Sequence, residues 1–74
     1  MSPAWAVILV FSTSYALKVE KMLKGAGIGC KLIPVPRHLS SDCGVCVRIE
    51  QSSRAAAWSL LAAAHVETEG VYDV

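Results

Sequence analysis

The chain has 74 residues, of which 54% are hydrophobic and 18% charged, and its formal net charge is +1. This hydrophobic content excludes a disordered chain, and the length predicts one small domain spanning residues 1–74. The seven basic and six acidic residues are scattered, so the charge pattern argues against nucleic acid as a partner. The apolar runs are far shorter than the roughly 20 residues that span a bilayer, so we expect no membrane partner either.

A run of β-branched and aromatic residues at 5–11, W-A-V-I-L-V-F, predicts a first strand with apolar side chains on both faces. The hydroxyl residues at 12–14 are suited to cap a helix that follows. Over residues 15–24 apolar side chains recur at helical spacing, with charged side chains between them. Gly25 and Gly27 then predict the end of this helix.

Two further strands are predicted in the middle of the chain, over residues 29–35 and 45–50. Pro34 favours an edge position for the first of them, because proline cannot donate a hydrogen bond to a neighbouring strand. Residues 36–43 form a polar loop between the two strands. In the later strand Val45, Val47 and Ile49 alternate with Cys46, Arg48 and Glu50, which predicts that the two sets lie on opposite faces.

The last part of the chain completes a recognisable order of elements. Residues 51–53 are expected to cap a second helix over residues 54–65, and a short fourth strand is predicted over residues 66–72. The order β-α-β-β-α-β is that of ferredoxin-like folds. The predicted class is therefore α+β, with a four-stranded antiparallel sheet and two helices on one face. The usual strand order in this fold is 4-1-3-2, which places the third strand beside the first and antiparallel to it.

The sheet face that the helices leave open is expected to be apolar. The first strand carries Ala6, Ile8 and Val10 on one side and apolar or aromatic residues on the other, so either orientation puts such side chains on the open face. A contiguous apolar patch on a small protein indicates an interaction surface. We therefore expect a homodimer through the open sheet face, or a docked partner.

Cys43 lies just before the predicted third strand. This topology places the start of that strand beside the end of the first strand, where the first helix begins. A helix N-terminus presents unpaired N–H groups and about half a positive charge, which stabilises a thiolate and lowers its pKa. Asp42 opposes this trend, since a neighbouring carboxylate raises the pKa of a thiol. The residues expected to bind an anion or cargo beside Cys43 are Ser12, Thr13, Gly44, Arg37 and Arg48.

Cys43 and Cys46 form a C-x-x-C motif, which raises the alternatives of a redox disulfide and a soft-metal site. Residues three apart in an extended strand are roughly 10 Å apart, whereas a disulfide needs Cα atoms within about 7 Å. The pair could bond only if the chain curls at Gly44. A zinc site would need two further ligands, so we expect no metal site.

The cysteine count and the amino terminus favour a cytoplasmic protein. Three cysteines are an odd number, and a disulfide-stabilised secreted domain more often carries four or more. The first residues, M-S-P-A-W, lack the positively charged region of a signal peptide. We expect all three cysteines to be thiols, with Cys30 as a small core residue.

A family resemblance rests on four stretches of the chain. They are F-S-T-S-Y-A-L at 11–17, E-K-M-L-K-G-A-G at 20–27, L-I-P-V-P-R at 32–37 and S-D-C-G-V-C-V-R at 41–48. Together they resemble the small family called Putative Se/S carrier protein-like, and P-V-P-R followed by D-C-G is the specific part. The resemblance implies a carrier of sulfur or selenium in which Cys43 is the working residue. The position of Cys46 is commonly a small or apolar residue in that family.

The resemblance implies donor and acceptor enzymes as partners, and no cofactor other than the sulfur or selenium carried covalently. Thiol exchange depends on thiolate fraction and access, which a loop cysteine beside a helix N-terminus would have. Cys46, if it can reach, would act as the resolving thiol. We expect a carrier rather than a complete enzyme. The alternatives are a ferredoxin-like binding or oligomerisation module, and dithiol redox or soft-metal chemistry at Cys43 and Cys46.

Overall fold

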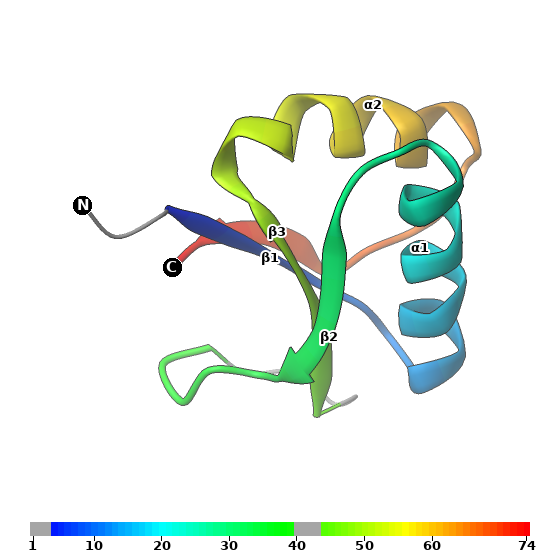
Figure 1. The fold of residues 1–74 in the computed structure, drawn as a ribbon. Helices are drawn as coiled ribbons and strands as arrows, with labels where there is room; N and C mark the ends of the chain where they lie inside the picture. Colours follow the sequence, from blue (N-terminus) through cyan, green and yellow to red (C-terminus); the bar gives the residue numbers. More distant parts are fainter. Residues whose placement is uncertain (1–3, 40–43) are drawn as a thin grey trace.

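A computed structural model describes residues 4–39 and 44–74, which form a twisted sheet with both helices on one side (Figure 1). Most elements begin and end within two residues of the predicted bounds, but the last strand, predicted from residue 66, begins only at Gly70. The strand and helix bounds in chain order are β1 (Trp5–Leu9), α1 (Thr13–Gly25), β2 (Cys30–Pro34), β3 (Val45–Glu50), a 3-10 turn η1 (Gln51–Ser53), α2 (Arg54–Ala63) and β4 (Gly70–Asp73).

The strands lie in the order β2-β3-β1-β4, and each neighbouring pair is antiparallel. This confirms the α+β class with a four-stranded antiparallel sheet in the described residues, and the order is 4-1-3-2 when read from the β4 edge. β2 lies at the other edge, where Pro34 was expected to place it. β3 lies between β2 and β1, so its buried apolar face can pack beneath the helices.

The main core lies between the sheet and the two helices. Ala6, Ile8 and Val10 face the helices, and β3 turns its valine and isoleucine side chains to the same side, as its alternation predicts. The buried members of this core are Ala6, Ile8, Val10, Ala16, Val19, Leu23, Val47, Ile49, Ala57 and Leu61. Burial of these side chains fixes which face of each element points inward, and so fixes the register of the sheet.

A second, smaller core lies on the opposite face of the sheet. Val7 and Cys46 are fully buried there and Leu9 is 3% exposed, because Val35 and Leu39 from the segment after β2 pack over them. Figure 1 shows this segment running along the side of the sheet away from the helices. The expectation of exposed apolar residues from the first strand is wrong at this position, because the chain covers that part of the face itself.

Both helices end in the same hydrogen-bonded motif. After α1, Ile28 N–H donates to Leu23 O at 2.8 Å, and Gly27 adopts a φ of 80°. After α2, Val66 N–H donates to Leu61 O at 3.0 Å, with His65 at a φ of 56° in the position that glycine usually takes. The predicted second helix therefore ends two residues early, because His65 adopts the left-handed conformation that terminates it.

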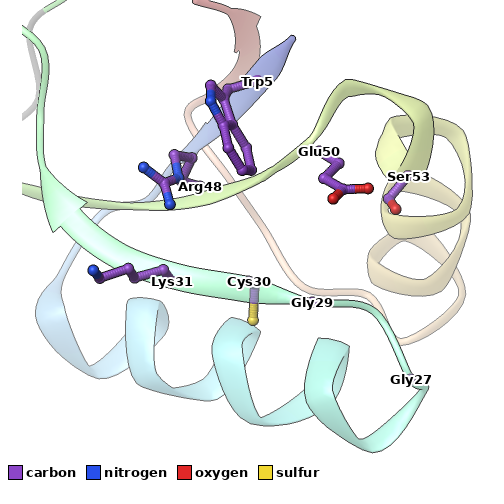
Figure 2. Close-up of a pocket in the computed structure, with 8 residues that line it drawn as sticks. All are labelled: Trp5, Gly27, Gly29, Cys30, Lys31, Arg48, Glu50 and Ser53. Atoms are coloured by element: carbon purple, nitrogen blue, oxygen red, sulfur yellow. The ribbon is translucent and has the colours of Figure 1, made fainter. Parts of the chain in front are cut away.

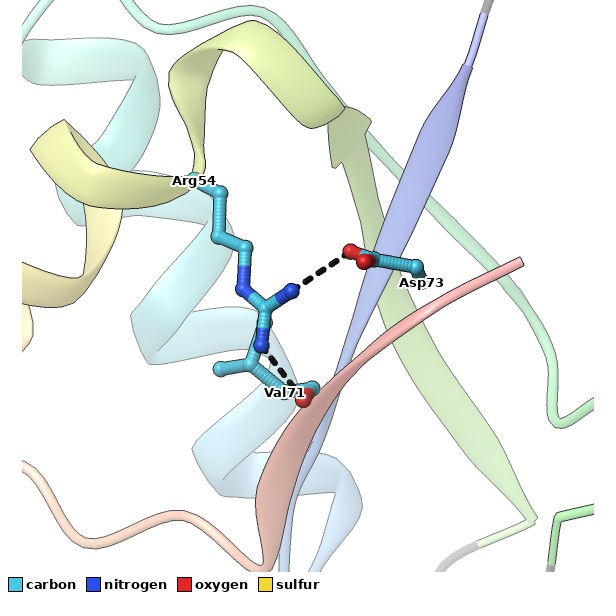
Figure 3. A network of polar contacts seen from close by, with 3 residues as sticks. All are labelled: Arg54, Val71 and Asp73. Atoms are coloured by element: carbon cyan, nitrogen blue, oxygen red, sulfur yellow. Dashed lines mark hydrogen bonds and ion pairs between the residues drawn. The ribbon is translucent and has the colours of Figure 1, made fainter.

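β4 is attached to α2 by one arginine. Arg54 Nη1 lies 2.6 Å from Asp73 Oδ1, and Arg54 Nη2 donates to Val71 O at 3.3 Å (Figure 3). Both charged side chains are largely exposed, so we expect this ion pair to contribute at most about 1 kcal/mol. It positions an edge strand more than it stabilises the domain.

Candidate functional site

The predicted cargo site lies where β1 ends, α1 begins and β3 starts. The register pairs Leu9 of β1 with Cys46 of β3, so the start of β3 lies beside the end of β1. Gly44 O accepts a hydrogen bond from Val35 N–H at 3.1 Å, which ties the start of β3 to the end of β2. The prediction for Cys43, together with Asp42, falls on residues outside the described part of the chain.

Ser12 and Thr13 are at the N-terminus of α1, as predicted. Ser12 is the N-cap, and its hydroxyl oxygen accepts a hydrogen bond from Tyr15 N–H at 3.3 Å. The first turn of α1 contains no acidic side chain. The positive end of the helix dipole is therefore not neutralised by a carboxylate of this turn. The local field there favours an anion.

Gly44, immediately after Cys43 in sequence, is required by its backbone conformation. Its φ is 78°, in the left-handed region that side chains other than glycine rarely adopt. A Cβ at this position would meet no other atom within 4 Å, so the requirement is conformational rather than steric.

The two arginines assigned to the cargo site lie in different places. Arg37 is exposed in the turn closed by Leu39 N–H donating to Pro36 O at 3.0 Å. Arg48 is paired in register with Val7 and stacks on Trp5, with 4.1 Å between its Cζ and the ring centroid. The structure therefore does not bring Arg48 together with Ser12, because Arg48 lies nearer the opposite end of the sheet.

Cys46 lies on the sheet face away from the helices, as the alternation of β3 predicts, and its side chain is inaccessible to solvent. Its thiol donates a weak hydrogen bond to Pro34 O at 3.9 Å. This burial supports packing as the role of Cys46. To act as a resolving thiol, Cys46 would first have to leave this core.

Cys30 packs against the main core, as expected for a small core residue, although its side chain is only partly buried. Its Sγ donates to Glu20 O at 3.6 Å. Burial raises the pKa of the Cys30 thiol above its ordinary value of 9.0, the charge of Glu20 raises it further, and the charge of Lys24 opposes both. Little thiolate therefore forms at Cys30 near neutral pH, which makes it a poor nucleophile.

We predict that Cys30 reacts more slowly with iodoacetamide at pH 8 than an unhindered cysteine does, because only the thiolate reacts. Glu20→Gln should increase the rate, since it removes a negative charge that raises the thiol pKa, and Lys24→Gln should decrease it. Peptide mass spectrometry of quenched samples across a pH series would measure both rates. Changes in the same direction for the two variants would contradict this electrostatic account.

Neither a metal-binding cluster nor a membrane-spanning helix is found in the described residues. Across 4–39 and 44–74, no cluster of three or more histidine, cysteine, aspartate or glutamate side chains could hold a metal ion. Within those same ranges, no helix has the length and apolar character needed to cross a membrane.

The sequence analysis missed the stacking of Arg48 on Trp5 and the packing of Leu39 against the smaller core that contains Cys46. The stacking of Arg48 on Trp5 follows from the pairing of β1 with β3. These strands are antiparallel neighbours, and Trp5 pairs with Glu50, which is two residues from Arg48. The second had no sequence signal, because a single leucine in a polar loop does not indicate which surface it covers.

Comparison with known proteins gives one match. The model of a family described as Putative Se/S carrier protein-like matches residues 6–73, which is most of the chain and includes every strand and helix at least in part. No curated protein and no solved structure matches the chain.

Proposed function

Because the chain belongs to the Putative Se/S carrier protein-like family, we propose that it holds sulfur or selenium on the thiolate of Cys43 and passes it on. The family match carries this proposal. The topology we propose is ferredoxin-like, in a single domain that acts as a carrier rather than an enzyme. Its expected setting is the cytoplasm, between a donor enzyme and an acceptor enzyme.

The N-terminus of α1 supports the choice of thiolate. Ser12 and Thr13 begin a helix whose first turn has no acidic side chain, and the start of β3 lies beside the end of β1 that leads into it. We propose that Ser12, Thr13, Gly44 and Arg37 provide the polar surroundings of Cys43. A helix N-terminus favours a thiolate over a thiol, and the thiolate is the nucleophile.

The transfer needs no external oxidant. The Cys43 thiolate attacks the terminal sulfur of a persulfide on the donor, a new S–S bond forms to Cys43, and the donor leaves as a thiolate. An acceptor thiolate then attacks the carried sulfur and releases Cys43 as the leaving thiolate. Each step breaks one S–S bond and makes another, and selenium in place of the transferred sulfur follows the same balance.

Mass spectrometry of intact protein after incubation with a persulfide donor, or with its selenium analogue R–S–Se⁻, tests this function. We expect an adduct on the wild type that disappears in Cys43→Ser, because that variant lacks the nucleophile. Cys30→Ala and Cys46→Ala serve as matched controls and should keep the adduct, since both side chains are at least partly buried. An adduct of undiminished yield in Cys43→Ser would contradict the assignment.

The dithiol alternative receives less support from the geometry. It requires Cys46 at the surface, but the Cys46 side chain has no exposed area. The homodimer remains a prediction, and the burial of Val7 and Leu9 by the chain's own loop removes the apolar surface on which it was based.

A further inference from the structure

β4 forms one edge of the sheet, because β1 is its neighbour on one side and no other described strand lies beyond it. Val74 N–H donates to Trp5 O at 3.0 Å, so the backbone groups of Val74 and Tyr72 face β1. Since these groups alternate in direction along a strand, the N–H and C=O groups of Val71 and Asp73 face away from the sheet. Such an outward row of donors and acceptors is a template for pairing with another strand.

Arg54, at the start of α2, crosses this outward row. Its Nη2 donates to Val71 O at 3.3 Å and its Nη1 lies 2.6 Å from Asp73 Oδ1, so the guanidinium lies alongside β4 between the two residues (Figure 3). The bond to Val71 O uses an acceptor that an added strand would need. An added strand would also have to break the ion pair or bury the guanidinium, and burying an unpaired charge is costly.

The opposite edge of the sheet, β2, is protected by residues of the strand itself. Val35 N–H donates to Gly44 O at 3.1 Å, so the preceding residue, Pro34, faces outward, where its missing N–H removes a donor. Lys31 is exposed, and Figure 2 shows its side chain extending from β2. Proline and lysine both discourage strand addition at an edge. β4 contains neither residue, so its protection has to come from another element, and Arg54 lies in the required place.

We propose that Arg54 closes the edge of β4 against strand pairing with a second copy of this chain. Two copies of β4 related by a twofold axis through Tyr72 would pair antiparallel, with Val71 of each opposite Asp73 of the other. The same arrangement would bring together the two copies of α2, on which Trp58 is 52% exposed. Trp58 and Val71 line a cavity of about 490 Å³ beside this edge, so apolar surface is available for a second copy to cover. This device extends beyond the carrier function and does not depend on it.

Analytical ultracentrifugation under reducing conditions tests the proposal, because reduced cysteines cannot link two copies through a disulfide. Arg54→Ala should self-associate at least about tenfold more strongly than the wild type, since it frees Val71 O and removes a charge from the edge. Arg54→Met keeps much of the side-chain length without the donors and should behave in the same way. Lys24→Ala is the matched control, because it removes another exposed ion pair, to Glu20 at 3.5 Å, and should not change self-association.

Hydrogen exchange measured by NMR locates the interface. The amide protons of Val71 and Asp73 point outward, so they should exchange rapidly in the wild type and become protected when Arg54→Ala associates. The amide of Val74, which donates to Trp5 O, should be protected in both proteins.

A second substitution in the Arg54→Ala background tests whether β4 is the pairing strand. Asp73→Pro removes an outward N–H and leaves the bonds to β1 in place, as Pro34 does on β2, so it should abolish the gain in self-association. The Arg54–Asp73 ion pair is exposed and contributes little to stability, so these variants should fold, which circular dichroism would check.

Three results would overturn the proposal. One is folded Arg54→Ala and Arg54→Met variants that associate no more strongly than the wild type. Another is an equal gain for Lys24→Ala, since the effect would then be a general one of surface charge. The third is a gain that persists after Asp73→Pro, or Val71 and Asp73 amides that are already protected in the wild type. In that case β4 would not be the interface, or Arg54 would not close it.

Discussion

Cys46→Asp is expected to lower the free energy of unfolding by about 4 kcal/mol or more at neutral pH, whereas Cys46→Ala should cost only about 1–2 kcal/mol. The Cys46 side chain is fully buried in a cluster with Val7 and Leu9, against which Val35 and Leu39 pack. An aspartate there would have to bury its carboxylate or expel the covering segment, at a cost of about 4 kcal/mol or more. A domain of this size has a total stability of roughly 4–11 kcal/mol, so this substitution would remove about a third of the stability or more.

Urea denaturation followed by circular dichroism would measure these differences. Cys30→Asp is the matched control, because Cys30 is only partly buried and a carboxylate there can reach water. We expect Cys30→Asp to be distinctly less destabilising than Cys46→Asp. Equal losses for the two variants would show that the segment after β2 does not exclude water from Cys46.

These variants also bear on the carrier function. A fully buried thiol cannot exchange with a partner protein unless its cover opens, because exchange requires the attacking and attacked sulfurs to meet in line. Cys46→Ala is expected to fold, so it can be assayed for the adduct on Cys43. If Cys46 only packs, loading and release should match those of the wild type.

Features with a local physical cause were predictable from the sequence. The alternation in β3 placed Cys46 and Arg48 on the face away from the main core. Pro34 placed β2 at an edge, and Ser12 capped α1. Each depends on a backbone rule that acts within a few residues, namely strand pleat, the missing proline N–H and the unpaired donors of a helix start.

Features that depend on tertiary contacts were not predictable. Arg48 was grouped with Ser12 from sequence proximity to Cys43, but strand register places it against Trp5. The end of α2 was placed too late, because the alanines before His65 all favour helix and nothing local indicates that a histidine will adopt positive φ. The role proposed for Cys43 rests on the family match and on the chemistry of a helix N-terminus.

Gly70→Ala is expected to lower the free energy of unfolding by about 2–3 kcal/mol, a large effect for a single methyl group. Gly70 begins β4 with a φ of 148°, a conformation that side chains other than glycine rarely adopt. A Cβ at this position would lie 2.9 Å from Cε2 of Tyr72, whose ring covers the glycine. The new methyl group therefore meets backbone strain, and it also requires the Tyr72 ring, which is 43% exposed, to shift.

A double-mutant cycle separates the two causes. Tyr72→Ala removes the clash but leaves the positive φ, so Gly70→Ala should be less destabilising in the Tyr72→Ala background than in the wild type. Gly29→Ala is the matched control, because no atom lies within 4 Å of its Cβ position and its φ is not positive. We expect that change to alter stability by less than about 1 kcal/mol in either direction. If Gly70→Ala were as mild as Gly29→Ala, β4 would not be held in the conformation that the structure shows, and its pairing with β1 would have to be reassessed.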